Sequence, residues 1–402
     1  MEWTRPAARA SLPWMRWLCL SLLVLLPWTT RAETMVRIAI GERLATVEVK
    51  GERMRLRAIG EEGGYRPVEG GALRLRRSPE GIAVEGRFGP GRAAAASEAP
   101  VPARGQATDG TLVVGGEAPT VKIRADGPIE VGDKVVRGSV EVMLAGGGLF
   151  AINEIPMETY LAAVLGSEMP PSFPPEALKA QAVAARTYAI GKKIGAEGEP
   201  YHLGSSVLSQ VYGGVHREDP RTLDAVRATE GEVLVFEHAP IEAYFFSSCG
   251  GRTETGRAAL SRDLPYLGSH ACPERPDTPG ARWTLELSAG ELGRRLGVAK
   301  PTAVRVAART GTGRAASIAL ETARGPRRID AVTFRRKVGY GELKSLAFDV
   351  ERRGGGFRFT GKGSGHGAGL CQWGAAAAAS EGWDYRRILA HYYPGTELRR
   401  MY

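Results

Sequence analysis

The chain has 402 residues, of which 43% are hydrophobic and 24% are charged, and its formal net charge is +10. This length exceeds that of one ordinary domain, and the composition excludes a wholly disordered chain. The positive charge favours a polyanionic partner, such as a nucleic acid, an anionic lipid or a cell-wall polymer, but does not choose among them.

The N-terminus has the pattern of a secretory signal. Arginines precede an apolar run over 17–28, and Thr30-Arg31-Ala32 resembles a small-x-small cleavage site. An uncleaved anchor is the alternative, but the run is shorter than the roughly 20 residues that span a bilayer. We therefore predict a signal peptide over 1–32 and an exported protein, periplasmic or associated with the cell wall. Export favours an anionic wall as partner and argues against nucleic acid.

Residues 36–149 are predicted to form a β-rich lobe of antiparallel strands. Short segments of alternating polar and apolar residues are separated by Gly, Pro and Asp, as is typical of such strands. The clearest of these segments lie at 37–40, 45–49, 111–114, 120–123 and 139–143. An Ala- and Pro-rich stretch over 91–103 predicts a long loop. No cluster of chemically reactive residues is evident in this lobe.

The stretch over 152–193 is predicted to form a helix, a break and a second helix. Pro156 suits a first helical position, and Gly166 can adopt the left-handed conformation that closes a helix, so the first helix should end before Glu168. The second should begin at Pro174-Pro175. Glu168 is then fixed in a short connection, and a fixed position is what a general acid requires.

Arg186 lies in the second helix, on a different face from the small apolar residues Ala182, Ala185 and Ala189. A solvated or salt-bridged helix residue is the interpretation that the sequence alone favours. The functional alternative is a cation that holds substrate or alters the pKa of Glu168.

Two turns are predicted to complete the site. A strand-like run over 241–246 leads directly into the small, polar and glycine residues over 247–254, a frequent way of presenting groups to a ligand, although an ordinary turn is the alternative. Five glycines surround His366 and require unusual backbone conformations or close approach, which makes His366 a stronger candidate than His216 or His238.

The remaining segments are predicted to be structural. Strand-like runs over 283–359 alternate with two short helices that open near Ser288 and Asp330. A helix is expected over 219–229, and a final helix should open at Asp384. Residues 150–402 are therefore predicted to form one domain, and the whole is expected to be an α+β fold with a mixed, β-rich core.

Two common enzyme classes are excluded by their motifs. The glycines over 363–369 follow no βαβ unit with an acidic residue at the required distance, so they do not form a dinucleotide site. Ser247 and Ser248 lack the Gly-x-Ser-x-Gly elbow of a serine hydrolase.

Three cysteines remain once the signal peptide and its Cys19 are removed. Cys249, Cys272 and Cys371 can form one disulfide and one thiol, or they can join His270 and His366 around a zinc ion, which needs about four N or S ligands. The spacing His270-Ala271-Cys272 is not a standard one. A Cys249–Cys272 disulfide and a structural zinc held by Cys249, His270, Cys272 and Cys371 therefore remain equal alternatives.

Three motifs occur in an order that resembles the stage II sporulation protein D family. They are Ser167-Glu168-Met169-Pro170 with the helix over 177–188, then Ser248-Cys249-Gly250-Gly251-Arg252-Thr253, then the run over 365–375. The resemblance covers nearly the whole mature chain and is weakest in the N-terminal lobe.

The resemblance implies a lytic transglycosylase that acts on peptidoglycan glycan strands already stripped of stem peptides. It also implies that Glu168 is the catalytic acid and that Arg186 and Tyr266 contact substrate. The family places a lysine two residues after this tyrosine, whereas this chain has Gly268, which puts substrate affinity or strand preference in doubt.

One carboxylate is enough for this chemistry. A hydrolytic glycosidase normally needs two, whereas Glu168 can protonate the glycosidic oxygen and then accept the proton of the sugar's own 6-hydroxyl as an anhydro ring closes. No cofactor is required. Relatives in the family act instead as enhancers of cell-wall amidases, so a non-catalytic peptidoglycan binder with an amidase partner is the alternative. Further substrate-binding candidates are Gln210, Tyr212, Ser248, His366 and Gln372.

Overall fold

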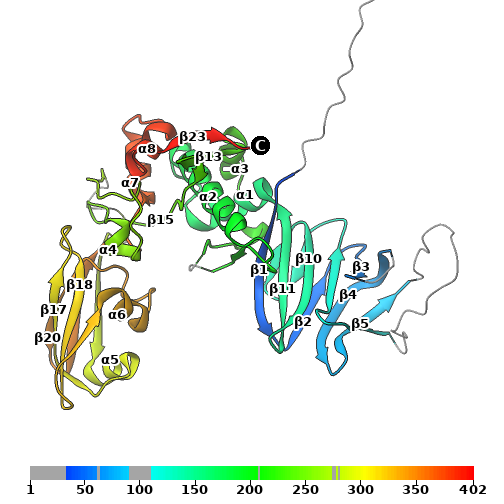
Figure 1. The fold of residues 1–402 in the computed structure, drawn as a ribbon, viewed down its shortest axis with the longest axis horizontal. Coiled ribbons are helices and arrows are strands. Elements are labelled where there is room, and N and C mark those ends of the chain that lie inside the picture. Colours follow the sequence, from blue (N-terminus) through cyan, green and yellow to red (C-terminus); the bar gives the residue numbers. More distant parts are fainter. Residues whose placement is uncertain (1–32, 61–63, 90–109, 207–208, 274–277, 279–280) are drawn as a thin grey trace, which may run out of the picture. The chain divides into compact units, whose positions relative to one another are not determined.

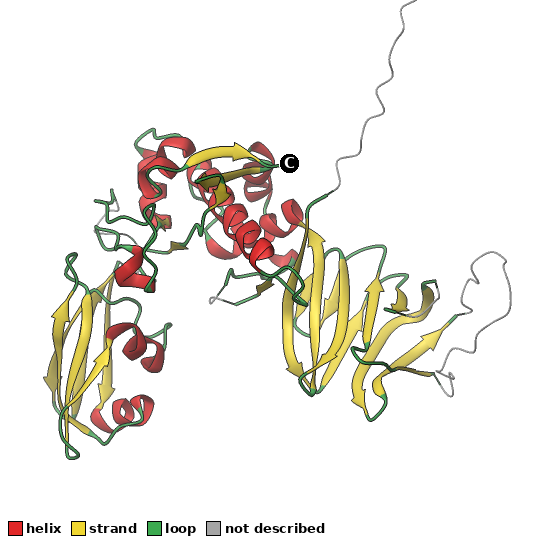
Figure 2. Cartoon of the chain, viewed as in Figure 1, coloured by secondary structure: helices red, strands yellow, loops and turns green. Residues whose placement is uncertain are grey.

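The computed structural model describes residues 33–60, 64–89, 110–206, 209–273, 278 and 281–402. The predicted signal peptide and the predicted loop over 91–103 lie outside these residues. Helices and strands are both abundant, and the predicted α+β class is confirmed (Figure 2). None of the helices in the described part is long and apolar enough to cross a bilayer.

The N-terminal strands pair into one curled sheet, and one of its strands, β11, leads through α1 to Glu168. Strand β11 pairs with both β1 and β10 and runs directly into α1 (Figure 1). The alternation is clear in β2, where Val47 and Val49 are buried and Glu48 and Lys50 are exposed. The strands are β1 (Met35–Leu44), β2 (Thr46–Lys50), β3 (Arg55–Ala58), β4 (Arg66–Ser78), β5 (Gly81–Phe88), β6 (Thr111–Val114), β7 (Thr120–Arg124), β8 (Ile129–Val131), β9 (Lys134–Val136), β10 (Ser139–Ala145), β11 (Gly148–Pro156) and β12 (Leu203–Gly204).

Helix α2 (Pro175–Gly195) is the packing centre of the helical part of the chain. It begins at Pro175, as predicted, and its acidic first turn and basic last turn complement the helix dipole. Alanines over 177–189 are buried around the helix rather than on one face, and their small size permits close packing. Its neighbours are α1 (Met157–Glu168), α3 (Pro220–Ala228), α7 (Gln372–Ser380), α8 (Tyr385–Tyr392) and β13 (Glu232–Phe236).

The first helix is longer than predicted, because α1 continues through Glu168 and its C-cap is Met169. Gly166 is helical and does not close the helix. A Cβ at this position would overlap the carbonyl oxygen of Arg217, at the end of the 3₁₀ turn Val215–Arg217. Glycine is therefore needed here for close approach of another segment, not for a left-handed backbone.

Two small sheets connect distant parts of the chain. Strand β13 pairs with β14 (Ala239–Pro240) and with β23 (Glu397–Arg400) near the end of the chain. The predicted strand over 241–246 is wrong for most of its length: only β15 (Phe245–Phe246) is extended, and it pairs in parallel with β22 (Leu370–Cys371). The reason is a tight backbone path in which Ala243 and Tyr244 bond to carbonyls two residues earlier.

Residues 282–362 form a lobe with a hydrophobic core of its own. Its two helices open where predicted, with Ser288 and Asp330 as N-caps. The lobe holds 18 lysines and arginines against 7 acidic residues, a formal charge of +11 that exceeds that of the whole chain. Its elements are β16 (Arg282–Ser288), α5 (Ala289–Leu296), β17 (Pro301–Arg309), β18 (Ala315–Thr322), β19 (Arg327–Asp330), α6 (Ala331–Val338), β20 (Phe348–Arg353) and β21 (Gly356–Lys362).

Candidate functional site

The carboxylate of Glu168 lies partly buried at the C-terminal end of α1. Its Oε1 accepts a hydrogen bond of 2.7 Å from the backbone N–H of Val211. Burial raises the pKa of Glu168, and the contacts with Val211 and the Gln372 side chain oppose this rise without cancelling it. The carboxyl group therefore keeps its proton to a higher pH than an ordinary glutamate, as a general acid requires.

Gln210 and Tyr212, both predicted to bind substrate, instead anchor the loop that holds Glu168. Both side chains are buried in the core. The Gln210 amide donates to the carbonyl of Ala185 at 3.0 Å, and the Tyr212 hydroxyl donates to Asn153 at 2.9 Å. The residue between them, Val211, is thereby fixed with its N–H toward Glu168. Their position indicates a supporting role and corrects the prediction of direct substrate contact.

Gln372 approaches Glu168 from the start of α7. Its side chain is buried, and its Nε2 lies near enough to the Glu168 carboxyl group to oppose the rise of its pKa, although no contact of Nε2 within the described residues has the full geometry of a hydrogen bond. The next residue, Trp373, is partly exposed, and its ring packs edge-on against Phe173, with 4.7 Å between the centroids. Because Phe173 belongs to the connection after Glu168, this contact holds the start of α7 beside the acid. The structure thus brings together Glu168 and Gln372, two of the residues that the sequence proposed for the site.

The sequence did not single out Trp373 or Gln181 as site residues. Gln181 of α2 is fully buried, and neither of its amide atoms has a hydrogen-bond partner among the described residues. Such an amide is costly unless something binds it. The signal for Trp373 was present, since an aromatic residue directly follows the glycine-rich turn, but an aromatic residue in a helix is more often part of a core.

Arg186 pairs with Glu158 and not with Glu168, which is the salt-bridged role that the sequence alone favoured rather than the alternative of a cation beside the acid. Its side chain is fully buried, and it forms a two-pronged ion pair with Glu158, with bonds of 2.8 and 2.5 Å. Further bonds run to the carbonyls of Val226 and Glu232 at 3.3 and 3.2 Å. A guanidinium enclosed in this way has no free donor for a ligand. The predicted substrate-binding role is therefore replaced by a structural one.

His366 and Ser248 hold two turns together. Ser248 and Ser364 exchange backbone hydrogen bonds of 2.9 and 2.7 Å. His366 uses both ring nitrogens, because Nε2 bonds to the Phe245 carbonyl at 2.9 Å and Nδ1 accepts from the Ala368 N–H at 3.2 Å. Burial lowers the pKa of His366 to about 4, and this hydrogen-bond pattern is that of a neutral imidazole. These contacts give the histidine a role in fixing the turn before Leu370.

Tyr266 is part of the main hydrophobic core. It is buried, its hydroxyl accepts from the Glu242 N–H at 3.1 Å, and its ring packs 5.7 Å from that of Phe236. None of these contacts involves Glu168, so substrate binding by Tyr266 stays a prediction.

The three cysteines meet at one point. The Sγ atoms of Cys249, Cys272 and Cys371 all lie within 4.8 Å of one another. Both alternatives left by the sequence, a Cys249–Cys272 disulfide and a structural zinc, require Cys249 and Cys272 to lie close together, as they do here. His270 is not part of the cluster, which corrects its predicted place as a ligand: its ring packs against that of His391, with centroids 5.4 Å apart.

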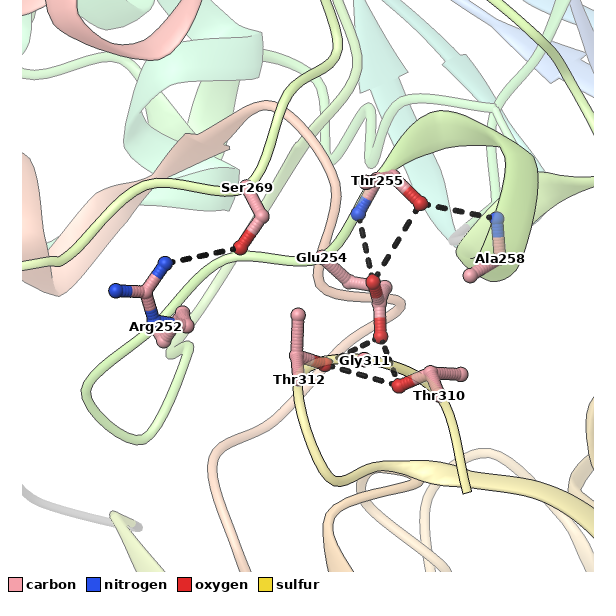
Figure 3. A pocket seen from close by; sticks show the side chains of 8 residues that line it. All are labelled: Arg252, Glu254, Thr255, Ala258, Ser269, Thr310, Gly311 and Thr312. Atoms are coloured by element: carbon pink, nitrogen blue, oxygen red, sulfur yellow. Dashed lines mark hydrogen bonds between the residues drawn. The ribbon is translucent and has the colours of Figure 1, made fainter. Parts of the chain in front are cut away.

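A cavity of about 400 Å³ lies apart from Glu168, between the turn that follows Cys249 and the hairpin that joins β17 to β18 (Figure 3). Its floor is the carboxylate of Glu254, which accepts from the Thr255 N–H at 2.8 Å and from the hydroxyls of Thr310 and Thr312. Because the charge is satisfied by these donors, Glu254 connects the lobe over 282–362 to the preceding turn. It is not poised for catalysis.

We expect Gly166→Ala to destabilise the protein by about 1–3 kcal/mol, because the added methyl group overlaps backbone that cannot easily move. It should also displace the end of α1 and therefore Glu168. Urea unfolding measures the first effect. Gly195→Ala is the matched control, since a Cβ there meets nothing and Ala favours a helix. Equal stability of the two variants would contradict the close approach seen at Gly166.

We expect Glu168→Gln to stabilise the fold at pH 7 and to have no such effect at pH 4. The pKa of Glu168 is raised in the folded state, so the wild type is at full stability below the unfolded-state pKa and loses stability as pH rises through the folded-state pKa. Glutamine has no charge to bury. Urea unfolding at both pH values tests this, and a gain that is independent of pH would contradict it.

Comparison with known proteins identifies a family whose model matches the part of the chain that carries Glu168. The model of the Stage II sporulation protein family matches residues 145–236, which contain α1, α2 and the loop that holds Glu168. Stage II sporulation protein D of Bacillus amyloliquefaciens is 34% identical over 266 residues, covering 62% of this chain and 75% of that protein. The protein of the same name from Bacillus subtilis is also 34% identical, over 62% of this chain and 76% of its own.

A third relative carries a different name. The amidase enhancer of Bacillus subtilis is 32% identical over 293 residues, covering 59% of this chain and 40% of that protein. The fold and these matches together define a protein with a cell-wall related function. The chain belongs to the stage II sporulation protein D family.

Proposed function

We propose that the protein is an exported lytic transglycosylase that cleaves peptidoglycan glycan strands, preferentially strands without stem peptides. The observation that carries this proposal is the partly buried Glu168, whose pKa is raised and whose carboxyl group is held by the Val211 N–H. No second carboxylate within the described residues contributes to the pKa of Glu168. A single acid of this kind suits a reaction in which the sugar supplies its own nucleophile.

The proposed reaction uses Glu168 twice. Because Oε1 accepts the Val211 N–H, the proton of the neutral acid resides on Oε2. Oε2 gives this proton to the glycosidic oxygen as the bond between that oxygen and C1 breaks. The 6-hydroxyl oxygen of the same sugar then bonds to C1, and its proton passes to the Glu168 carboxylate. The products are an anhydro-muramyl end and a strand with a new hydroxyl, and the acid is restored.

Neighbouring groups suit a carbohydrate substrate. The Gln372 Nε2 lies beside the acid and has a donor to offer, and Trp373 exposes part of a flat apolar ring next to it. Sugars commonly pack on such rings, which bring apolar contact area at a low entropic cost. The lobe with a formal charge of +11 offers favourable long-range electrostatics toward an anionic wall.

The second candidate is a non-catalytic binder that enhances a cell-wall amidase. The relative named amidase enhancer favours this function. In this case the groups around Glu168 would hold a glycan strand without cleaving it, and an amidase would be the catalytic partner.

Digestion of purified, denuded glycan strands tests the proposal. We expect products with anhydro-muramyl ends, detected by mass spectrometry, alongside a known transglycosylase as the active control. Absence of these products while the control reacts would overturn the proposal. In a parallel assay on intact wall, a rise in the activity of an added amidase without anhydro products would establish the second candidate instead.

A further inference from the structure

We propose that Cys249, Cys272 and Cys371 form a zinc site that fixes the start of α7. The three residues come from segments far apart in sequence: a glycine-rich turn, an irregular segment and strand β22. Their sulfur atoms nevertheless lie within 4.8 Å of one another. Ligands at the usual zinc–sulfur distance of about 2.3 Å would have sulfurs roughly 3.8 Å apart, so only a small contraction is needed to bind the ion.

Backbone donors surround the sulfur atoms as they do around metal-bound thiolates. The N–H groups of Cys249 and Gly374 donate to the Cys371 sulfur at 3.3 and 3.4 Å, and the Gly251 N–H donates to the Cys249 sulfur at 3.3 Å. Such donors and the N-terminal end of α7, of which Cys371 is the N-cap, favour negative charge on the sulfurs. Three thiolates would not be stable together here without a cation.

Gly374 makes room for the third sulfur. A Cβ at this position would overlap both the Cys272 sulfur and the Tyr392 hydroxyl. That hydroxyl lies 3.1 Å from the Cys272 sulfur and borders the cluster, where it is available as a fourth donor. The local sequence therefore favours convergence of the three sulfurs at a site with one further oxygen.

Zinc suits this donor set better than the alternatives. A disulfide between two of the cysteines would leave the third sulfur unexplained, whereas one metal ion accounts for all three. Soft thiolate ligands select zinc, copper(I) or iron–sulfur clusters, and the clusters ordinarily require four cysteines. Zinc has no redox chemistry of its own, and it protects thiolates in an exported protein from the oxidation that its surroundings promote.

A metal ion at this site would hold the residues next to Glu168 in place, because one of its ligands directly precedes them in the chain. Cys371 directly precedes Gln372, whose side chain reaches the acid, and Trp373, whose N–H donates to the Ser247 carbonyl at 3.1 Å. A metal that binds Cys371 would therefore fix the first turn of α7 at the acid. This role does not depend on the proposed reaction, since metal content and activity are measured separately.

The test is the metal content of the full chain, purified from the envelope fraction without chelators. We expect about one zinc per chain by mass spectrometry, and cysteines that react with a thiol reagent only after chelation. Replacement by Co²⁺ should give the intense thiolate-to-cobalt absorption. Metal-free protein, either with three reactive thiols or with one disulfide and one thiol, would overturn the proposal whatever the enzymatic activity.

Variants identify the ligands. We expect Cys249→Ser, Cys272→Ser and Cys371→Ser each to lower the zinc content at least about 10-fold. His270→Ala is the matched control: it is adjacent to the cluster in sequence but outside it in the structure, so its zinc content should equal that of the wild type. Loss of zinc in His270→Ala, or full retention in any cysteine variant, would overturn the three-cysteine site. The wild-type measurement stands even if a cysteine variant does not fold.

Discussion

Glu168→Gln is expected to lower the rate of anhydro-end formation by about 10²–10⁴-fold, the usual contribution of a positioned general acid. Glutamine keeps the size of the side chain and can still accept the Val211 N–H through its amide oxygen. What it loses is the proton for the leaving oxygen. The expected loss is therefore in kcat rather than in KM.

The control for this variant is Glu381→Gln, an exposed glutamate at the end of α7 that should leave the rate unchanged. Retention of glycan by Glu168→Gln on denuded strands would show that the site still binds. The rate of the wild type should also fall as pH rises through the raised pKa of Glu168, because the acid form is lost. Wild-type rates in Glu168→Gln would contradict a catalytic role.

Local sequence signals were sufficient for most of the secondary structure. Caps such as Ser288, Asp330 and Asp384 act within one helical turn, so the sequence predicted where these helices begin. The prediction that Gly166 ends the first helix was wrong, because the role of this glycine depends on a contact with a distant segment of the chain. Whether a glycine ends a helix or admits a neighbour depends on the carbonyl of Arg217, which reaches it only in the tertiary structure.

The residues of the candidate site also differ in whether their roles depend on local sequence or on distant contacts. Glu168 was identified from its local setting between a helix and two prolines, and in the structure burial raises its pKa. The roles of Gln210 and Tyr212 depend on partners about 25 and 59 residues away, which no local pattern specifies. A polar residue beside a glycine pair looks the same in sequence whether its side chain faces a ligand or the core.

Arg186→Met is expected to destabilise the protein by about 3–5 kcal/mol, because it leaves Glu158 without its cation and also removes bonds to two backbone carbonyls. The Glu158 carboxylate would keep the Tyr402 hydroxyl, which donates to it at 2.6 Å, but one neutral donor does not replace a guanidinium. Urea unfolding at pH 7 measures the loss. Arg227→Met is the matched control, since Arg227 is exposed on the nearby α3 and its substitution should cost less than about 0.5 kcal/mol.

A second substitution separates the structural role of Arg186 from contact with substrate. In the double variant Glu158→Gln with Arg186→Met, no charge is left unpaired, so part of the lost stability should return. The folded part of the double-variant protein should have the same KM for glycan as the wild type, because the enclosed guanidinium does not reach a ligand. A stable Arg186→Met protein with a raised KM would instead show that Arg186 binds substrate.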